Sequence, residues 1–292
     1  MKQIKIGTCV PGTKAEEWLK GFAGKGFETF SINFHMSLEG TDLDKLALST
    51  EKLLAGTDSK ITTVGYYCNP IQYAEHRKTL ENVICTAGKF GATHVSTFAG
   101  AWEGKPVESA YEEFGKVFRE LADLAEEKGV KLGIENCLMD GTWEHATCNI
   151  GFNPKAWEVM FEEVKNDNFG LEWEPTHQMV QLIDPVTELR KWCKKIVHVH
   201  GKDATIDWDA VRHGGISGAV PFVWHRMPGF GDTNWRDIIS ILRSNGYEDD
   251  ICIEGYHDPV YNGELEMTGQ LHALNYLKWC RGGEFTPTPW EK

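Results

Sequence analysis

Short runs of β-branched and other apolar residues alternate along the chain with longer segments in which apolar residues recur at helical spacing. The first pattern predicts buried strands, and the second predicts amphipathic helices. The predicted strands span Lys5–Cys9, Thr29–Asn33, Ile61–Tyr67, His94–Phe98, Val130–Glu135, Gly170–Glu174, Ile196–His200 and Ile251–Glu254. The predicted helices span Lys14–Phe22, Ala74–Phe90, Val107–Lys128, Pro154–Val164, Thr187–Cys193, Trp235–Asn245 and Glu264–Trp279. Strand and helix therefore alternate from one end of the chain to the other.

Such alternation favours a parallel sheet with right-handed crossovers. Eight strand–helix units in 292 residues fit a closed (β/α)₈ TIM barrel better than an open, doubly wound sheet. No predicted strand leads into the Gly-x-Gly-x-x-Gly turn of dinucleotide-binding sheets. No linker or change of composition divides the sequence, so we expect one α/β domain over residues 1–292. The longest stretch without a predicted element, Ala204–Gly231, is expected to be either an active-site lid or a plain surface insertion.

The composition and net charge of the chain indicate which classes of binding partner it has. The chain is 41% hydrophobic and 25% charged, and its formal net charge is −13. Because an acidic surface repels phosphate backbones and anionic lipids, we expect neither a nucleic acid nor a membrane partner. No apolar run approaches the roughly 20 residues of a membrane span. The eight cysteines form no Cys-x-x-Cys pair and are expected to be reduced thiols of a cytoplasmic protein.

Polar residues of chemical interest stand at the ends of the last four predicted strands. They are Glu135, Glu174, His200 and Glu254. In a parallel barrel these strand ends meet at one rim, where catalytic side chains lie. Taken alone, an acidic residue at a strand end is more often a solvated loop residue or a helix cap than a metal ligand. Three carboxylates and one imidazole gathered at one rim, however, would repel one another without a cation, and they suit Mn²⁺, Mg²⁺ or Co²⁺ better than a structural zinc.

From about Val130 to Pro259 the chain resembles the sugar phosphate isomerase/epimerase superfamily with the xylose isomerase-like barrel. The segments that carry this resemblance are Ile134-Glu135-Asn136, Glu174-Pro175-Thr176-His177, His198-Val199-His200-Gly201-Lys202-Asp203, Arg226-Met227-Pro228-Gly229-Phe230-Gly231 and Ile253-Glu254. The first half of the chain matches only in its alternation of strands and helices. The resemblance therefore supports the barrel and places its chemistry in the second half of the chain.

The resemblance implies that one divalent cation is bound by Glu135, Glu174, His200 and Glu254. Mn²⁺ is the favoured ion, with Mg²⁺, Co²⁺ and Zn²⁺ as alternatives. Relatives usually carry aspartate where this chain has Glu174. Glu172 lies on the same strand face, one layer deeper, and is the second candidate for that ligand position.

Further residues are implied to act around the cation. His177 would contact substrate oxygens, or else cap the next helix. Arg226 would reach the substrate from the loop after the seventh strand, or else form a surface ion pair. Lys202 and Asp203 would hold His200, or else form an exposed ion pair. Three tryptophans are expected in rim loops, where they would stack on a sugar or pack in the core: Trp102, Trp143 and Trp224.

By this resemblance the protein is a metal-dependent sugar isomerase or epimerase that acts on a small sugar or polyol. Glu135 and Glu254 would be its catalytic base and acid, transferring a proton through an enediolate held by the metal. The same enediolate can expel a β-hydroxyl or a glycosidic group, so a lyase or dehydratase acting on a keto-inositol or 3-keto-glycoside is the alternative. A non-catalytic sugar-binding barrel is a third hypothesis. Barrels of this superfamily often assemble as homo-oligomers, and by this analogy alone a homo-oligomer is one open alternative for the present chain.

Overall fold

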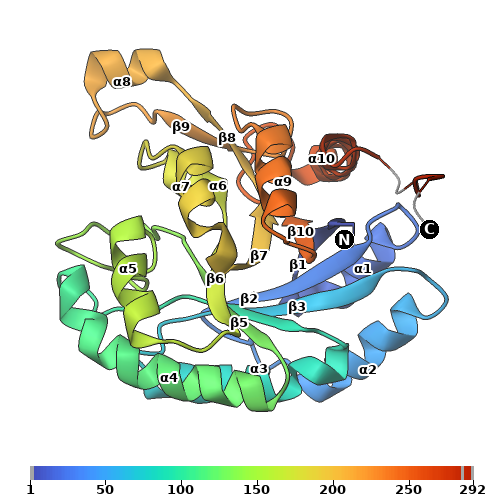
Figure 1. Cartoon of the computed structure of the whole chain (residues 1–292), viewed down its shortest axis with the longest axis horizontal. Coiled ribbons are helices and arrows are strands. Elements are labelled where there is room, and N and C mark those ends of the chain that lie inside the picture. The colour runs from blue at the N-terminus through green and yellow to red at the C-terminus, as the bar shows by residue number, and fades with distance from the viewer. Residues whose placement is uncertain (1–2, 284–285, 291–292) are drawn as a thin grey trace.

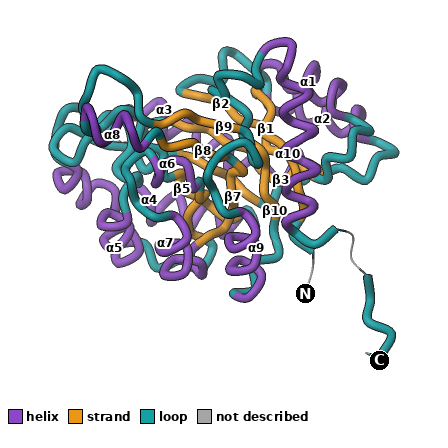
Figure 2. Tube along the Cα trace, turned by 90° about the horizontal axis from the view of Figure 1, so that it is seen from above, coloured by secondary structure: helices purple, strands orange, loops and turns teal. Residues whose placement is uncertain are grey.

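A closed barrel of parallel strands, surrounded by helices, forms the centre of the molecule (Figures 1 and 2). The computed structural model describes residues 3–283 and 286–290. The barrel strands are β1 (Lys5–Pro11), β2 (Thr29–His35), β3 (Lys60–Tyr67), β4 (His94–Thr97), β5 (Lys131–Glu135), β6 (Phe169–Trp173), β7 (Ile196–Gly201) and β10 (Asp250–Ile253). They follow one another around the barrel in chain order, and β10 pairs with β1 to close it. The predicted (β/α)₈ TIM barrel is confirmed.

Helices that follow the barrel strands form the outer layer. They are α1 (Ala15–Phe22), α2 (Leu43–Leu54), α3 (Ala74–Ala87), α4 (Tyr111–Glu127), α5 (Pro154–Glu163), α7 (Pro185–Trp192), α9 (Trp235–Ser244) and α10 (Glu266–Cys280). Each turns an apolar face to the strands. On α4, Phe114 and Phe118 lie 6.3 and 6.1 Å from the ring of Phe169 in β6. Much of the apolar core therefore lies between strands and helices.

The sequence pattern predicts no helix between the second and third strands, and this is wrong, because α2 (Leu43–Leu54) lies there. The carboxylate of Asp42 accepts a hydrogen bond from the backbone N–H of Lys45 at 3.1 Å and so caps the first turn. The buried Leu43, Leu46 and Leu54 follow at helical spacing. The cap and the spacing were therefore both present in the sequence.

The stretch predicted to lack regular structure contains a projecting hairpin. Strands β8 (Asp203–Ile206) and β9 (Val223–Arg226) pair antiparallel, and α8 (Trp208–Gly214) lies between them in the chain. Figure 1 shows this unit extending away from the barrel. Each of the two strands is only 4 residues long, so their pattern was too short to predict them.

Asp203 organises the base of this hairpin. Its buried carboxylate accepts hydrogen bonds, at 2.8 to 3.3 Å, from the backbone N–H groups of Ala204, Gly229, Gly231 and Thr233. Asp203 therefore neither holds His200 nor forms an exposed ion pair, and both interpretations of this residue are wrong.

Two further findings concern membrane-spanning helices and disulfide bonds. No helix within residues 3–283 and 286–290 is long and apolar enough to cross a membrane. The eight cysteines all lie within these residues, and none of them forms a disulfide.

Candidate metal centre and active site

The four residues implied as metal ligands lie together at the C-terminal rim of the barrel. Glu135 is the last residue of β5, Glu174 follows β6, His200 lies near the end of β7 and Glu254 follows β10. One ligand atom of each lies within 4.8 Å of those of the other three. Since these strands are neighbours in the barrel, residues far apart in the sequence meet where parallel strands end.

His200 turns one ring nitrogen toward the carboxylates. Nδ1 lies 2.9 Å from Oε1 of Glu135, 3.2 Å from Oε2 of Glu254 and 3.6 Å from Oε2 of Glu174. The other nitrogen, Nε2, lies 3.2 Å from Oε1 of Glu172. Metal-binding histidines commonly donate their second ring N–H to a carboxylate in this way. The buried ring can therefore give Nδ1 to a cation while Glu172 holds its other edge.

Glu172 and Glu174 have different surroundings. The carboxylate of Glu172 accepts hydrogen bonds from the hydroxyl groups of Tyr67 and Ser96 at 2.8 and 2.6 Å. It also lies 2.6 Å from Nδ1 of His198. Both oxygens of Glu174 are buried, and neither accepts a hydrogen bond from the described residues. Glu174 is thus the carboxylate of the two whose oxygens lack a hydrogen-bond donor, and its rank above Glu172 as a ligand stays a prediction.

The donor set fits a divalent cation. Besides the two oxygens of Glu174, Oε2 of Glu254 is buried without a hydrogen-bond partner in the described part of the chain. Buried carboxylate oxygens left in this state cost free energy unless a cation or a ligand contacts them. Three carboxylates with one imidazole are a suitable donor set for Mn²⁺, Mg²⁺ or Zn²⁺. The geometry therefore supports a metal centre made by these four residues.

Burial and neighbouring charges separate the proton affinities of the carboxylates. Burial raises the pKa of Glu135 to about 7, against the hydrogen bond from His200, and raises the pKa of Glu174 well above its usual range. Burial acts in the same direction on Glu254, but Lys202 and His200 hold the pKa of Glu254 well below its usual range. Without a cation, therefore, Glu254 stays ionised at neutral pH while Glu135 exchanges its proton.

Lys202 is the cation that pairs with this cluster. Its side chain is only 2% exposed, and Nζ lies 3.0 Å from Oε1 of Glu254 and 3.8 Å from Oε1 of Glu174. The interpretation of Lys202 as part of an exposed ion pair is therefore wrong. Its charge offsets part of the repulsion among the carboxylates.

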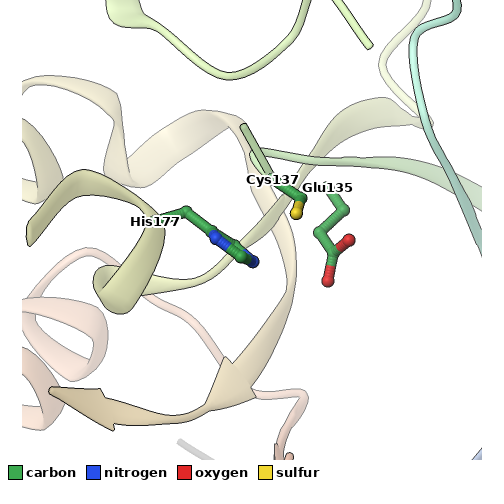
Figure 3. Close-up of side chains that lie close together, drawn as sticks. All are labelled: Glu135, Cys137 and His177. Carbon is green, nitrogen blue, oxygen red and sulfur yellow. The ribbon is translucent and has the colours of Figure 1, made fainter. Parts of the chain in front are cut away.

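The metal centre opens into a cavity of about 940 Å³. Glu135, Cys137 and His177 lie on its wall, and Figure 3 shows their side chains gathered around one space. His177 belongs to the short helix α6 (Pro175–Met179), and its Nε2 lies 3.1 Å from Oε1 of Glu174. Burial lowers the pKa of His177 well below its usual range. A neutral imidazole in this position can hydrogen-bond a substrate oxygen.

Arg226 forms an ion pair with a carboxylate, which was one of its two interpretations. Its Nε lies 3.2 Å from Oδ2 of Asp258, and its guanidinium group lies 5.7 Å from the ring centroid of Phe230. His225, the preceding residue, lines the cavity, whereas Arg226 is not among the described residues that do. Successive side chains of a strand point to opposite faces, which accounts for the difference. A substrate contact by Arg226 remains a prediction.

The aromatic lining of the cavity was missed by the sequence analysis. Tyr67, Phe98 and Tyr256 line it, and among the described lining residues there is no tryptophan. Trp102 and Trp143 instead pack against the core, and Trp224 is exposed on the hairpin. Position at a strand end could have indicated Tyr67, which is the last residue of β3.

A model of the xylose isomerase-like TIM barrel family matches residues 22–278. The chain belongs to this family. The resemblance noted in the second half of the sequence is thereby confirmed and extended over most of the chain.

Several proteins of known name are similar to this chain in sequence or in fold. The chain is 27% identical over 182 residues to the inosose dehydratase of Clostridium tetani, a match that covers 61% of this chain and 57% of that protein. The match thus spans little more than half of that relative. The 3-keto-D-glucoside 4-epimerase of E. coli superposes with a TM-score of 0.70 at 15% identity, over 95% of this chain and 100% of the other. IOLI protein with a bound zinc atom superposes with a TM-score of 0.65 at 19% identity, covering 95% and 96%.

Proposed function

We propose that this chain is a divalent-metal-dependent enzyme that transfers a proton at a carbon beside the carbonyl group of a sugar or a keto-polyol. The observation that carries the proposal is the convergence of Glu135 and Glu254 on Nδ1 of His200. When bound by these residues and Glu174, a divalent cation would withdraw electron density from substrate oxygens and make the adjacent C–H more acidic. Mn²⁺ is the ion we propose first.

Glu135 and Glu254 are the proposed base and acid. They extend from β5 and β10, which are separated in the barrel by β6 and β7, so they approach a substrate from different directions. One carboxylate removes a proton, and the other carboxylic group returns one. When the proton is returned to the same carbon from the opposite face, the product is an epimer. When it is returned to the neighbouring carbon, an aldose becomes a ketose or the reverse.

His177 is proposed to orient the substrate. Its neutral ring lies on the cavity wall beside Glu174 and Glu135, where it can hydrogen-bond a hydroxyl or carbonyl oxygen. Fixing that oxygen places the reacting carbon between the two carboxylates, which lowers the entropic cost of the proton transfer.

An isomerase or epimerase is our first proposal, and a dehydratase or other lyase is the second. After the same proton removal, loss of a β-hydroxyl group gives dehydration, and loss of a glycosidic group gives elimination. The similarity to inosose dehydratases favours the second proposal. The likeness to the 3-keto-D-glucoside 4-epimerase is a likeness of fold and favours neither.

Incubation of the Mn²⁺-loaded protein with ketoses, inososes and 3-keto-glycosides in D₂O, followed by NMR and mass spectrometry, tests both proposals. A recovered epimer or isomer that carries deuterium supports the first. A product that has lost water or an alcohol supports the second. If the metal-loaded protein exchanges no proton in any of these substrates, both proposals fail and the sugar-binding hypothesis takes their place.

A further inference from the structure

A row of aromatic rings leads from the metal centre along one wall of the cavity. The ring centroid of Tyr67 lies 6.2 Å from that of His200, Phe98 follows at 5.3 Å from Tyr67, and His35 at 6.1 Å from Phe98. Tyr67, Phe98 and His35 all line the cavity. Tyr67 and Phe98 are buried, whereas His35 is exposed. The row therefore connects a proposed metal ligand to solvent.

Apolar side chains reinforce this wall. Tyr67 and Phe98 form, with Cys148, a small hydrophobic cluster separate from the main core. Met139 packs against the cluster and also lines the cavity. Apolar surface that faces a cavity beside a few convergent polar groups is typical of a ligand-binding site.

The backbone next to this wall is held in an unfavourable conformation. Met36 and Glu39, after β2, have φ of 56° and 49°, and Met139 and Asp140, after β5, have φ of 49° and 57°. A non-glycine residue in this region costs of the order of 1–3 kcal/mol, and such residues gather at ligand-binding sites. Glu39, Met139 and Asp140 line the cavity. Met36 and Met139, one from each loop, both pack against the cluster of Tyr67, Phe98 and Cys148.

The charges of the cavity argue against an anionic occupant. Among the described residues that line it, Lys202 is the only lysine or arginine, and Glu254 and Glu174 already pair with its charge. Glu39 and Asp140 add carboxylates to the lining. A phosphate group here would find no unpaired cation and would be repelled by carboxylates.

We propose that the row Tyr67–Phe98–His35, together with Met139, is a second subsite that binds an uncharged aromatic ring attached to the sugar. The substrate is then a keto-sugar that carries such a ring, rather than a free sugar or a sugar phosphate. This identification rests on the proposed function for the sugar end of the site. A cavity of about 940 Å³ lies near the upper end of the roughly 300–1,000 Å³ range of ligand sites, and it has room for a ring beside a sugar.

Binding of unreactive glucosides to the Mn²⁺-loaded protein tests the subsite. Calorimetry or ligand-detected NMR would compare phenyl β-D-glucoside with methyl β-D-glucoside and with glucose 6-phosphate. We expect the phenyl compound to bind about tenfold tighter than the methyl compound, because the ring is desolvated against aromatic groups. Equal binding of the two glucosides, binding of neither, or tightest binding of glucose 6-phosphate overturns the proposal.

Two variants locate the effect. Met139→Asn removes the apolar side chain while keeping a residue that tolerates positive φ, and His35→Ala removes the exposed ring. Both should reduce the phenyl-to-methyl preference to about twofold or less. Leu182→Asn is the matched control, because Leu182 also has a positive φ, of 57°, and is not among the described residues that line the cavity. Preference unchanged in both test variants, or lost equally in the control, contradicts the subsite.

Proton exchange distinguishes this inference from the proposed function. Exchange of solvent deuterium into a sugar without any preference for phenyl compounds rejects the subsite alone. A clear phenyl preference in a protein that exchanges no proton rejects the proposed function alone.

Discussion

Nε2 of His200 lies 3.2 Å from Oε1 of Glu172, on the opposite edge of the ring from the nitrogen that faces Glu135. Glu172 also lies 2.6 Å from Nδ1 of His198, whose Nε2 is 3.5 Å from Oδ1 of Asp250. This buried series of polar groups holds the ring of His200 from the side away from Glu135. Glu172 therefore acts as a positioning residue behind a proposed metal ligand.

Glu172→Gln should weaken Mn²⁺ binding about 10- to 100-fold, because the amide no longer supplies a charged acceptor for the His200 N–H. Titration of EDTA-stripped protein with Mn²⁺ measures the effect. Glu28→Gln is the control: Glu28 pairs with Arg281 and precedes β2, at the end of the barrel away from the metal centre. Unchanged Mn²⁺ affinity in Glu172→Gln, with the control also unchanged, would mean that His200 is oriented without Glu172.

Glu135→Gln and Glu254→Gln should each reduce deuterium exchange by at least about 100-fold, since each keeps the size of the side chain and removes its basicity. NMR of recovered sugar measures the exchange. The metal content of each variant must be measured in the same samples, because both residues are also proposed metal ligands. Near-normal exchange in either variant at full metal occupancy would remove that residue from the proton transfer.

Glu174→Asp should retain part of the Mn²⁺ affinity, and Glu174→Ala should lose most of it. The aspartate keeps a carboxylate at this position, whereas alanine leaves the cation with three protein ligands instead of four. Metal stoichiometry after EDTA treatment and Mn²⁺ titration distinguishes the two. Full metal content in Glu174→Ala would show that the buried oxygens of Glu174 serve another purpose.

The metal-free protein should lose stability as the pH rises through about 7. Burial raises the pKa of Glu135 from 4.5 to about 7, so the folded state binds more protons than the unfolded state between these values. The contribution of protonated Glu135 to the free energy of unfolding is therefore complete below about pH 4.5, and it is lost as the pH rises through about 7. Mn²⁺ needs ionised carboxylates and should raise the melting temperature more at pH 8 than at pH 5. Thermal melts with EDTA and with Mn²⁺ measure both effects, and an equal Mn²⁺ effect at the two pH values contradicts this linkage.

Arg226→Lys should lower stability by about 1 kcal/mol and change KM less than twofold, because the side chain pairs with Asp258 and loses its planar fork. Thermal melts and steady-state kinetics measure the two quantities. A large rise in KM with unchanged stability would instead support the substrate contact that the resemblance implies for Arg226.

The alternation of apolar runs was enough to predict the barrel, because the spacing of buried side chains is a local property of strands and helices. The ends of β5, β6, β7 and β10 could be located for the same reason, and with them Glu135, Glu174, His200 and Glu254. Strand alternation placed Glu174 and Glu172 on one face, and the resemblance together with the greater depth of Glu172 ranked Glu174 first. Helix α2 (Leu43–Leu54) shows that a local signal can be present and still be missed.

Relations between distant segments depended on the tertiary structure. Lys202 is two residues from His200 in the sequence, yet its burial against Glu254 depends on the pairing of β7 with β10. The aromatic row joins residues of β2, β3 and the end of β4, which no local pattern connects. His225 and Arg226 are neighbours in β9, yet His225 lines the cavity whereas Arg226 pairs with Asp258. The sequence by itself determined the kinds of residues at the rim and the strands that carry them. Only closure of the barrel decided which side chains meet, because contact, burial and pKa depend on neighbours that the chain brings together from far apart.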